Sequence, residues 1–199
     1  MTKENPKRNL YDFDGTIYDG NCSVDFFIYC LVQNPKLIKY IPQNLKDLLN
    51  IKLKRLELEQ SKTNYCQFLI DIKDLEIFIL KFWKQNLKKI KTWYLEQKQE
   101  SDIIITTSPS FLINPICSYL NIQAISTIIN QENGEILELC YRGKKLEMLN
   151  KDYKDVTFDS FYTDNPSDDE CLSSKAKQTF LVKGNKRIKL PNFPNQSKN

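Results

Sequence analysis

Two aspartates stand two residues apart near the start of the chain, in the stretch Tyr11-Asp12-Phe13-Asp14-Gly15-Thr16-Ile17. A short strand is predicted over residues 9–13, and it leads directly into a turn at Gly15. Open α/β sheets place their binding sites at the carboxyl ends of their strands, so two carboxylates at this position can converge on one cation. The spacing therefore predicts an acidic, cation-binding site at Asp12 and Asp14.

A calcium-binding loop is the obvious competing interpretation of this stretch. An EF-hand loop that begins at Asp12 needs glycine at its sixth position and glutamate at its twelfth, where this sequence has Ile17 and Ser23. The calcium-loop interpretation therefore fails. A plain turn, in which Asp and Gly serve local hydrogen bonding, stays open for the motif taken alone.

The chain of 199 residues contains no histidine and six cysteines that form no CxxC pair. The missing histidine excludes Ser-His-Asp and Cys-His catalysis, as well as zinc sites of the histidine type. The scattered cysteines are expected to be free and mostly buried thiols. Catalysis must therefore come from carboxylates, lysines, hydroxyls or a bound metal.

The elements that must position these groups alternate between strands and helices. After Ser101, the run Asp102-Ile103-Ile104-Ile105-Thr106-Thr107 is typical of a strand buried on both faces. Further strands are predicted at 123–128, 135–139, 156–162 and 179–182, and helices at 110–120, 144–151 and 168–176. This alternation predicts an α/β fold with a Rossmann-like, three-layer core around a parallel sheet.

The segment from Cys22 to Glu100 has a helical period instead. Apolar stripes recur at 24–31, 45–56 and 75–83, and we expect them to face one another in an all-helical module. Both ends of this insertion lie beside the chemistry, so it is expected to be a cap that closes over the site. A rigid module that completes the core is the alternative.

These patterns divide the chain into three parts. The α/β core is predicted to comprise residues 1–21 and 101–185, and the helical cap residues 22–100. The remaining segment, residues 186–199, is basic and contains two prolines, so it is expected to be a flexible tail.

Four segments of the sequence resemble, in order, the four motifs of the haloacid dehalogenase (HAD) superfamily. Asp12-Phe13-Asp14-Gly15-Thr16 resembles the first motif, residues 103–109 the second, residues 140–149 the third and residues 161–168 the fourth. The helical insertion between the first two motifs, and the sequence Thr107-Ser108-Pro109, are similar to the phosphoserine-phosphatase-like branch.

The resemblance implies a role for each matched residue. Asp12 would attack the substrate and become an aspartyl phosphate, and Asp14 would act as the general acid and base. Thr106 and Thr107 would bind the transferring phosphoryl group with a hydroxyl and with backbone N–H groups. Lys145 would hold the phosphate and screen Asp12 from neighbouring negative charge.

The cofactor implied by the resemblance is Mg²⁺, which prefers oxygen ligands and few protein carboxylates. The implied ligands are Asp12, the backbone carbonyl of Asp14, and Asp164, with Asp168 as a further ligand or supporting partner. Asp168 matches the spacing of the family's fourth motif. The alternative is that Asp168 and Asp169 only cap the helix that follows them.

The third motif leaves a choice between two adjacent lysines. Lys145 is preferred because Lys145-Leu146 followed by Leu149 resembles the family's pattern of a lysine and later apolar residues. Lys144 is the alternative, and either residue would also be compatible with a surface lysine.

The sequence as a whole predicts a Mg²⁺-dependent phosphatase that hydrolyses a small phosphorylated metabolite. A phosphotransferase or phosphomutase on the same fold stays open, and so does a non-catalytic protein whose basic insertion binds an anionic partner. The mild net charge of +4 does not predict nucleic acid as a partner.

No apolar run approaches the roughly 18 residues of a membrane span. The segment from Met1 to Asn9 lacks the apolar middle section of a secretory signal, so a cytoplasmic location is expected. The identity of the phosphomonoester and the oligomeric state stay open.

Overall fold

A seven-stranded sheet forms the centre of the computed structural model, which describes residues 8–191. The strands are β1 (Asn9–Tyr11), β2 (Ile103–Pro109), β3 (Gln123–Ile129), β4 (Ile136–Glu138), β5 (Ser160–Thr163), β6 (Thr179–Lys183) and β7 (Lys186–Lys189). Their order across the sheet is β4-β3-β2-β1-β5-β6-β7. The five central strands are parallel, and β4 and β7 are antiparallel at the two edges. The predicted α/β fold is confirmed.

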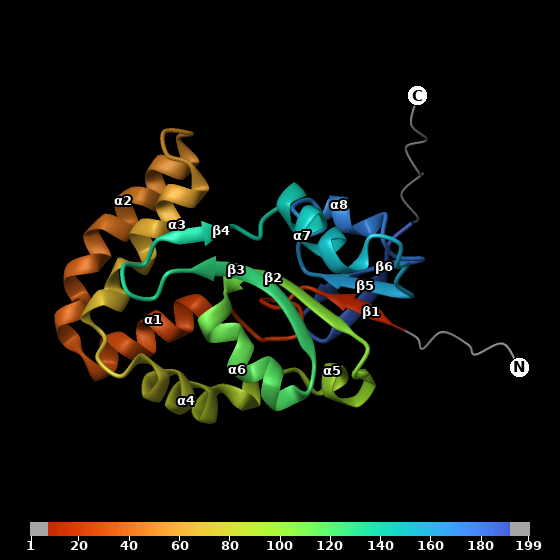
Figure 1. Ribbon diagram of the computed structural model, residues 1–199, viewed down its shortest axis with the longest axis horizontal. Helices are drawn as coiled ribbons and strands as arrows, with labels where there is room; N and C mark the ends of the chain where they lie inside the picture. The colour runs from red at the N-terminus through yellow and green to blue at the C-terminus, as the bar shows by residue number, and fades with distance from the viewer. Residues whose placement is uncertain (1–7, 192–199) are drawn as a thin grey trace, which may run out of the picture.

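Helices cover both faces of the sheet. The insertion between β1 and β2 contains α1 (Cys22–Gln33), α2 (Ile41–Lys52), α3 (Leu58–Cys66), α4 (Leu75–Asn86) and α5 (Thr92–Gln97). Between its helices lie the short 3-10 segments η1 (Pro35–Tyr40), η2 (Gln67–Asp71) and η3 (Leu87–Lys89). The other helices are α6 (Ser110–Leu120), α7 (Gly143–Tyr153) and α8 (Glu170–Ser173). Figure 1 shows α5 and α6 on one face of the sheet, α7 and α8 on the other, and α1 to α4 beside them. In the described part of the chain, no helix combines the length and the apolar character needed to cross a membrane.

The two faces of the sheet have separate apolar clusters because successive strand residues point to opposite sides. Leu10, Ile103 and Ile105 pack in a cluster with residues of α7 and α8. Tyr11 follows Leu10 in β1, and Ile104 lies between Ile103 and Ile105 in β2. Both belong to a second cluster with α6 and the helices of the insertion. A sheet buried in this way on both faces explains the β-branched run in β2.

The end of the chain differs from the flexible tail expected from residue 186 onwards. Lys186–Lys189 form β7, which pairs with β6 through a turn at Gly184 and Asn185. Gly184 has a φ of 57°, the left-handed conformation that a two-residue Gly-Asn hairpin turn requires. In the sequence, the dipeptide Gly184-Asn185 is the feature that indicates the hairpin of β6 and β7. Residues 192–199 of the expected tail lie outside the described residues.

The expected burial of the helical stripes holds for α4 and fails for α1 and α2. In α4, Ile79, Phe82 and Trp83 are buried. In α1, Phe27 is buried as expected, but Val24 and Ile28 are about half exposed. The neighbouring aromatic residue Phe26 and two cysteines fill the interior instead. In α2, the leucines of the expected stripe face outward.

The two ends of the insertion are joined by backbone hydrogen bonds. The N–H of Asp19 donates to the carbonyl of Lys89, and the N–H of Lys91 donates to the carbonyl of Ile17, both at 2.8 Å. The next helix, α5, packs Tyr94 edge-on against Tyr11 of β1, with ring centroids 5.1 Å apart. Because α5 packs on the core sheet, we propose that the cap comprises residues 22–89 and not 22–100.

The insertion and the sheet share one continuous apolar cluster. Phe26 of α1 lies 6.0 Å from Phe111 of α6, measured between ring centroids. The indole N–H of Trp83 in α4 donates a hydrogen bond of 2.8 Å to the carbonyl of Leu112. This shared interior favours a rigid module that completes the core over a freely hinged cap.

Candidate active site

Asp12 lies at the carboxyl end of β1, at the centre of the sheet. Its backbone N–H donates to the carbonyl of Tyr162 at 2.9 Å, which extends the pairing of β1 with β5 by one residue. The side chain is buried. Strand pairing therefore fixes the Asp12 carboxylate at the edge of the sheet where binding sites of open α/β folds lie.

Lys145, in the first turn of α7, joins Asp12 to a second carboxylate. Its ammonium nitrogen lies 2.9 Å from Oδ1 of Asp12 and 2.7 Å from Oδ1 of Asp169. Lys145 is only 3% exposed. Lys144 lies on the surface and pairs with Glu147 at 2.6 Å. The structure thus brings Lys145, and not its neighbour Lys144, to the site.

The second carboxylate belongs to Asp169, where the sequence pattern indicated Asp168. Oδ2 of Asp169 accepts a hydrogen bond of 2.6 Å from the Thr163 hydroxyl at the end of β5. Asp168 turns outward and pairs with Arg142 at 2.9 Å. The turn before α8 therefore directs Asp169 toward Lys145 and leaves Asp168 at the surface. We replace Asp168 by Asp169 in the proposed site.

Asp14 is fixed by two donors on its two carboxylate oxygens. The N–H of Cys22, at the start of α1, donates to Oδ1 at 2.6 Å, and the hydroxyl of Ser108 donates to Oδ2 at 2.5 Å. Burial raises the pKa of Asp14, although both donors oppose that shift. Ser108 was not among the predicted site residues, and its place after Thr106-Thr107 was the available signal.

Thr106 and Thr107 lie at the carboxyl end of β2, beside Ser108. Thr106 is buried, and its hydroxyl oxygen accepts a hydrogen bond of 3.2 Å from the N–H of Ser108. Thr107 is partly exposed, and its carbonyl accepts from the Thr127 hydroxyl at 2.8 Å. Both predicted threonines therefore belong to the edge of the sheet that carries Asp12.

Gly15 allows Asp164 to approach the first motif. The φ of Gly15 is 72°, and a Cβ atom at this position would come within 2.1 Å of Oδ2 of Asp164. Any larger side chain would therefore displace Asp164 or the turn. The ammonium of Lys91 donates to the Gly15 carbonyl at 2.5 Å and holds this turn from the side of the insertion.

Several buried carboxylates repel one another at this edge. Burial raises the pKa of Asp12 to about 7, Lys145 opposes the shift, and the charge of Asp169 adds to it. Asp164 is exposed, but partial desolvation still raises its pKa, and Asp169 and Asp14 add to that shift. For Lys145, burial lowers the pKa, but the two adjacent carboxylates outweigh burial and raise it overall. A bound cation would relieve the repulsion between these carboxylates.

The donor set fits a magnesium ion better than a metal held entirely by side chains. Among residues 8–191, no group of three or more Cys, Asp or Glu side chains is placed to hold a metal ion. Asp164 nevertheless lies against Gly15, three residues after Asp12, and the backbone carbonyl of Asp14 is a further oxygen donor in this turn. Mg²⁺ keeps several of its waters and needs only one or two carboxylates, so these residues fit it.

Lys62 of α3, in the insertion, interacts electrostatically with Asp14. The side chain is partly buried, and burial lowers its pKa, whereas the nearby Cys66, Asp14 and Cys22 oppose that shift. The helical period of the insertion gave no sign that this lysine would differ from the others.

Comparisons with known proteins show the fold. No protein-family model matches the sequence, and no curated protein matches it. Among solved structures, a protein of unknown function from Bordetella pertussis Tohama I has a TM-score of 0.72 at 15% identity, over 88% of this chain and 89% of that one. A phosphoserine phosphohydrolase-like protein from Francisella tularensis subsp. tularensis SCHU S4 has a TM-score of 0.54 at 19% identity, over 87% and 85%.

A probable phosphoserine phosphatase from Vibrio cholerae has a TM-score of 0.55 at 14% identity, over 87% of this chain and 55% of that one. These likenesses show that the chain shares its fold with phosphoserine phosphatases, a phosphoserine phosphohydrolase-like protein and a HAD family hydrolase. The resemblance read from the sequence motifs is confirmed at the level of the fold.

Proposed function

We propose that this chain is a Mg²⁺-dependent phosphatase that hydrolyses a small phosphomonoester through an aspartyl phosphate on Asp12. The observation that carries the proposal is the buried contact between the Asp12 carboxylate and Lys145, with Asp14 fixed two residues further on. The names of several proteins with the same fold, which include phosphoserine phosphatases, add support.

The nucleophile in this proposal is a carboxylate oxygen of Asp12. It attacks the phosphorus atom, the bond from phosphorus to the substrate oxygen breaks, and the phosphoryl group is transferred to Asp12. Lys145 favours this step because its positive charge offsets repulsion between the carboxylate and the phosphate dianion. The N–H and hydroxyl groups at the end of β2, near Thr106, would bind the phosphoryl oxygens.

Asp14 supplies and removes the protons. As a general acid it donates a proton to the leaving alkoxide, and as a general base it then takes a proton from the water that hydrolyses the aspartyl phosphate. Burial raises the pKa of Asp14, which favours the protonated form that the first step needs. Ser108 keeps the carboxylate in place between the two steps.

Asp12, Asp164 and the backbone carbonyl of Asp14 would hold Mg²⁺ in this proposal. When bound, the ion would offset negative charge on the transferring phosphoryl group. Asp169 would not need to contact it, because Lys145 and Thr163 already engage both of its oxygens. We assign Asp169 the role of orienting Lys145.

The substrate would enter between this edge of the sheet and α3. Lys62 of α3 interacts electrostatically with Asp14 and would add positive charge on that side, which favours an anionic substrate. A phosphotransferase or phosphomutase would use the same residues up to the aspartyl phosphate and differ only in the acceptor. Detection of inorganic phosphate as the product separates hydrolysis from transfer.

The test is hydrolysis of p-nitrophenyl phosphate by purified protein, followed by release of inorganic phosphate. Turnover should require Mg²⁺, disappear with EDTA, return on addition of Mg²⁺, and be inhibited by Ca²⁺, which has a larger and looser coordination shell. The Asp12→Asn variant, purified in the same way, controls for contaminating phosphatases and should be inactive. Turnover that persists after metal removal, or in Asp12→Asn, would refute the proposal.

A further inference from the structure

Helix α2 is turned the opposite way from an ordinary surface helix. Its Asp47 is only 3% exposed and accepts hydrogen bonds of 2.8 Å from Gln43 in the same helix and from Asn64 in α3. The side-chain oxygen of Asn44 is buried as well. The side of α2 that faces the protein therefore buries polar groups, beside the partly buried Ile41 at the start of the helix.

The outward side of α2 is apolar. Leu45, Leu48 and Leu49 of α2, and Leu53 directly after it, are 62%, 58%, 57% and 49% exposed, and Leu45 lies three and four residues from Leu48 and Leu49. This spacing places their side chains on one stripe of the helix. A helix of a globular protein normally buries such a stripe and exposes its polar side. The reversed arrangement indicates that the outward side of α2 contacts an apolar environment.

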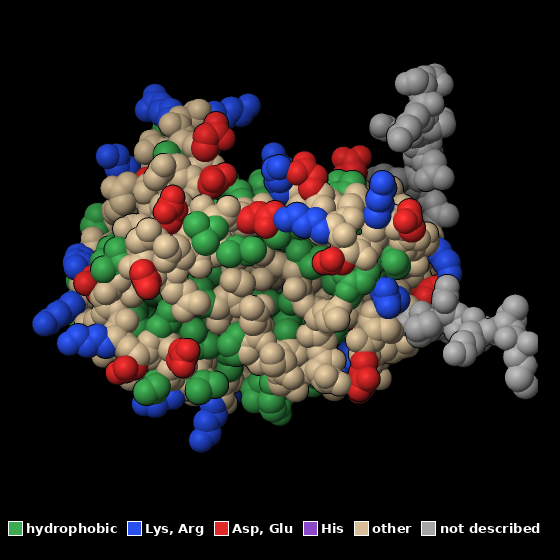
Figure 2. Space-filling model, viewed as in Figure 1, with side chains coloured by type: hydrophobic (Ala, Val, Ile, Leu, Met, Phe, Trp, Pro, Cys, Tyr) green, Lys and Arg blue, Asp and Glu red, His purple; other side chains and the backbone are tan. Residues whose placement is uncertain are grey.

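Basic residues accompany the exposed leucines. Lys46, Lys52, Lys54 and Arg55 are all exposed, and none of them forms an ion pair with another described residue. Asp47, the acidic residue of this segment, is buried beneath the helix. The next acidic residues along the chain, Glu57 and Glu59, accompany the start of α3. Figure 2 shows Lys and Arg side chains projecting from the side and tip of the molecule where α2 lies.

We propose that the outward side of α2 docks on the surface of an anionic lipid bilayer. The four leucines would enter the boundary between headgroups and acyl chains, while the flanking basic residues would contact anionic headgroups. Helices that lie in a membrane interface combine these features: an apolar stripe, a basic flank and low net hydrophobicity. Each attraction alone is weak, and together they give reversible binding.

Two other partners fit the surface less well. A nucleic acid would use the basic residues but gain little from four exposed leucines, because its outer surface is a row of phosphates. A second copy of the chain, paired through the same stripe, would bring two sets of basic residues together, and this like-charge contact is unfavourable. An anionic bilayer satisfies both the apolar and the charged residues.

The test is flotation of the full chain with vesicles of phosphatidylcholine, prepared with or without phosphatidylglycerol. The protein should float with the anionic vesicles and stay behind with phosphatidylcholine alone. Leu45→Gln/Leu49→Gln should weaken binding about tenfold or more, because two half-buried leucine contacts with the bilayer are lost. Glutamine has a helix propensity close to that of leucine, so α2 should keep its structure.

A matched control uses another helix of the insertion. Ile77 and Leu80 of α4 are 48% and 64% exposed, so Ile77→Gln/Leu80→Gln removes a similar apolar area away from α2. This variant should float like the wild type. Circular dichroism and thermal unfolding should be the same for both double variants. Equal loss of binding in both variants would overturn the assignment to α2.

The charge contribution is tested separately. Lys46→Gln/Lys52→Gln should weaken binding to the anionic vesicles about tenfold, and added salt should have a similar effect.

Absence of flotation with the wild-type protein would overturn the proposal. So would a concentration-dependent dimer that Leu45→Gln/Leu49→Gln abolishes, because the stripe would then be an interface between copies. Binding to nucleic acid that the leucine variants leave intact, without flotation, would assign the surface to a nucleic acid.

Discussion

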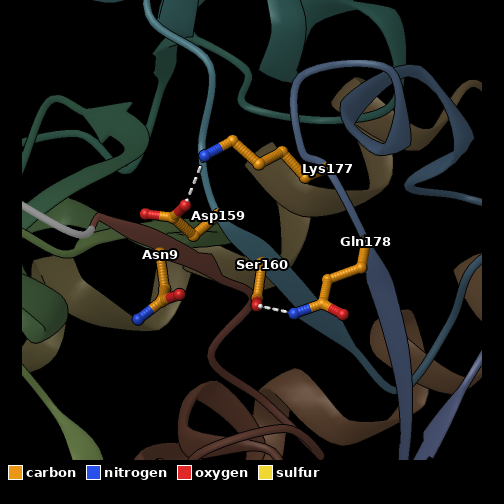
Figure 3. A pocket seen from close by; sticks show the side chains of 5 residues that line it. All are labelled: Asn9, Asp159, Ser160, Lys177 and Gln178. Atoms are coloured by element: carbon orange, nitrogen blue, oxygen red, sulfur yellow. Dashed lines mark hydrogen bonds and ion pairs between the residues drawn. The ribbon is translucent and has the colours of Figure 1, made fainter.

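The two edges of the sheet carry polar residues of similar kinds in different surroundings. At the carboxyl edge, Lys145 and Asp12 form their ion pair with side chains only 4% and 11% exposed. At the amino edge, Lys177 and Asp159 pair at 2.7 Å, but their side chains are 66% and 29% exposed. Figure 3 shows this second group around a surface cavity of about 440 Å³, lined by Asn9, Asp159, Ser160, Lys177 and Gln178.

A cavity by itself does not identify where the chemistry of this fold takes place. The amino edge has the open cavity, yet Gln178 and Ser160 there hydrogen-bond to each other at 3.0 Å, and the ion pair beside them is screened by solvent. At the carboxyl edge, buried charges interact strongly because little water separates them. The raised pKa values of Asp12 and Asp14 follow from that burial.

The largest expected difference between the edges concerns the proposed general acid. Asp14→Asn should reduce hydrolysis of an alkyl phosphate by ~10²–10⁴-fold, because its leaving group needs a proton. Asp159→Asn, the matched substitution at the amino edge, should leave turnover unchanged. With p-nitrophenyl phosphate, which has a good leaving group, the loss in Asp14→Asn should be smaller. An equal loss with both substrates would remove Asp14 from its role as general acid.

The second prediction compares two adjacent lysines. Lys145→Ala should lower turnover about 10²–10³-fold, since a buried charge that offsets the phosphate is lost. It should also lower the melting temperature, because Asp12 and Asp169 lose their shared cation. Lys144→Ala removes only a surface pair with Glu147 and should change neither quantity appreciably. The opposite ranking in the kinetic assay would mean that Lys144 is the functional lysine.

The third and smallest effect concerns two adjacent aspartates. Asp169→Asn should reduce turnover about 10–100-fold, the usual cost of losing a residue that orients a functional group. Asp168→Asn should have almost no effect, because it removes a surface contact with Arg142. Steady-state kinetics with saturating Mg²⁺ checks both variants. A greater loss for Asp168→Asn would restore the residue that the motif spacing indicated.

Much of the fold was predictable because it follows from local patterns. Helix α6 has the bounds 110–120 expected from its apolar period, and β2 includes the predicted β-branched run. The hairpin of β6 and β7 was missed because its signal is a single Gly-Asn dipeptide within a basic segment. The burial of α1 and α2 was misjudged because a helical period identifies a stripe but does not say which side meets the protein.

The residue types available at the site, and their order along the chain, could be read from the sequence alone. Without histidine, an Asp-x-Asp motif after a strand and a later lysine and acidic cluster restrict the chemistry to carboxylates, lysines, hydroxyls and a metal. The folded structure was needed to distinguish Asp169 from Asp168, to bring Ser108 to Asp14 and to turn the leucines of α2 outward. The physical reason is that these choices depend on contacts between segments far apart in the chain, which no local spacing encodes.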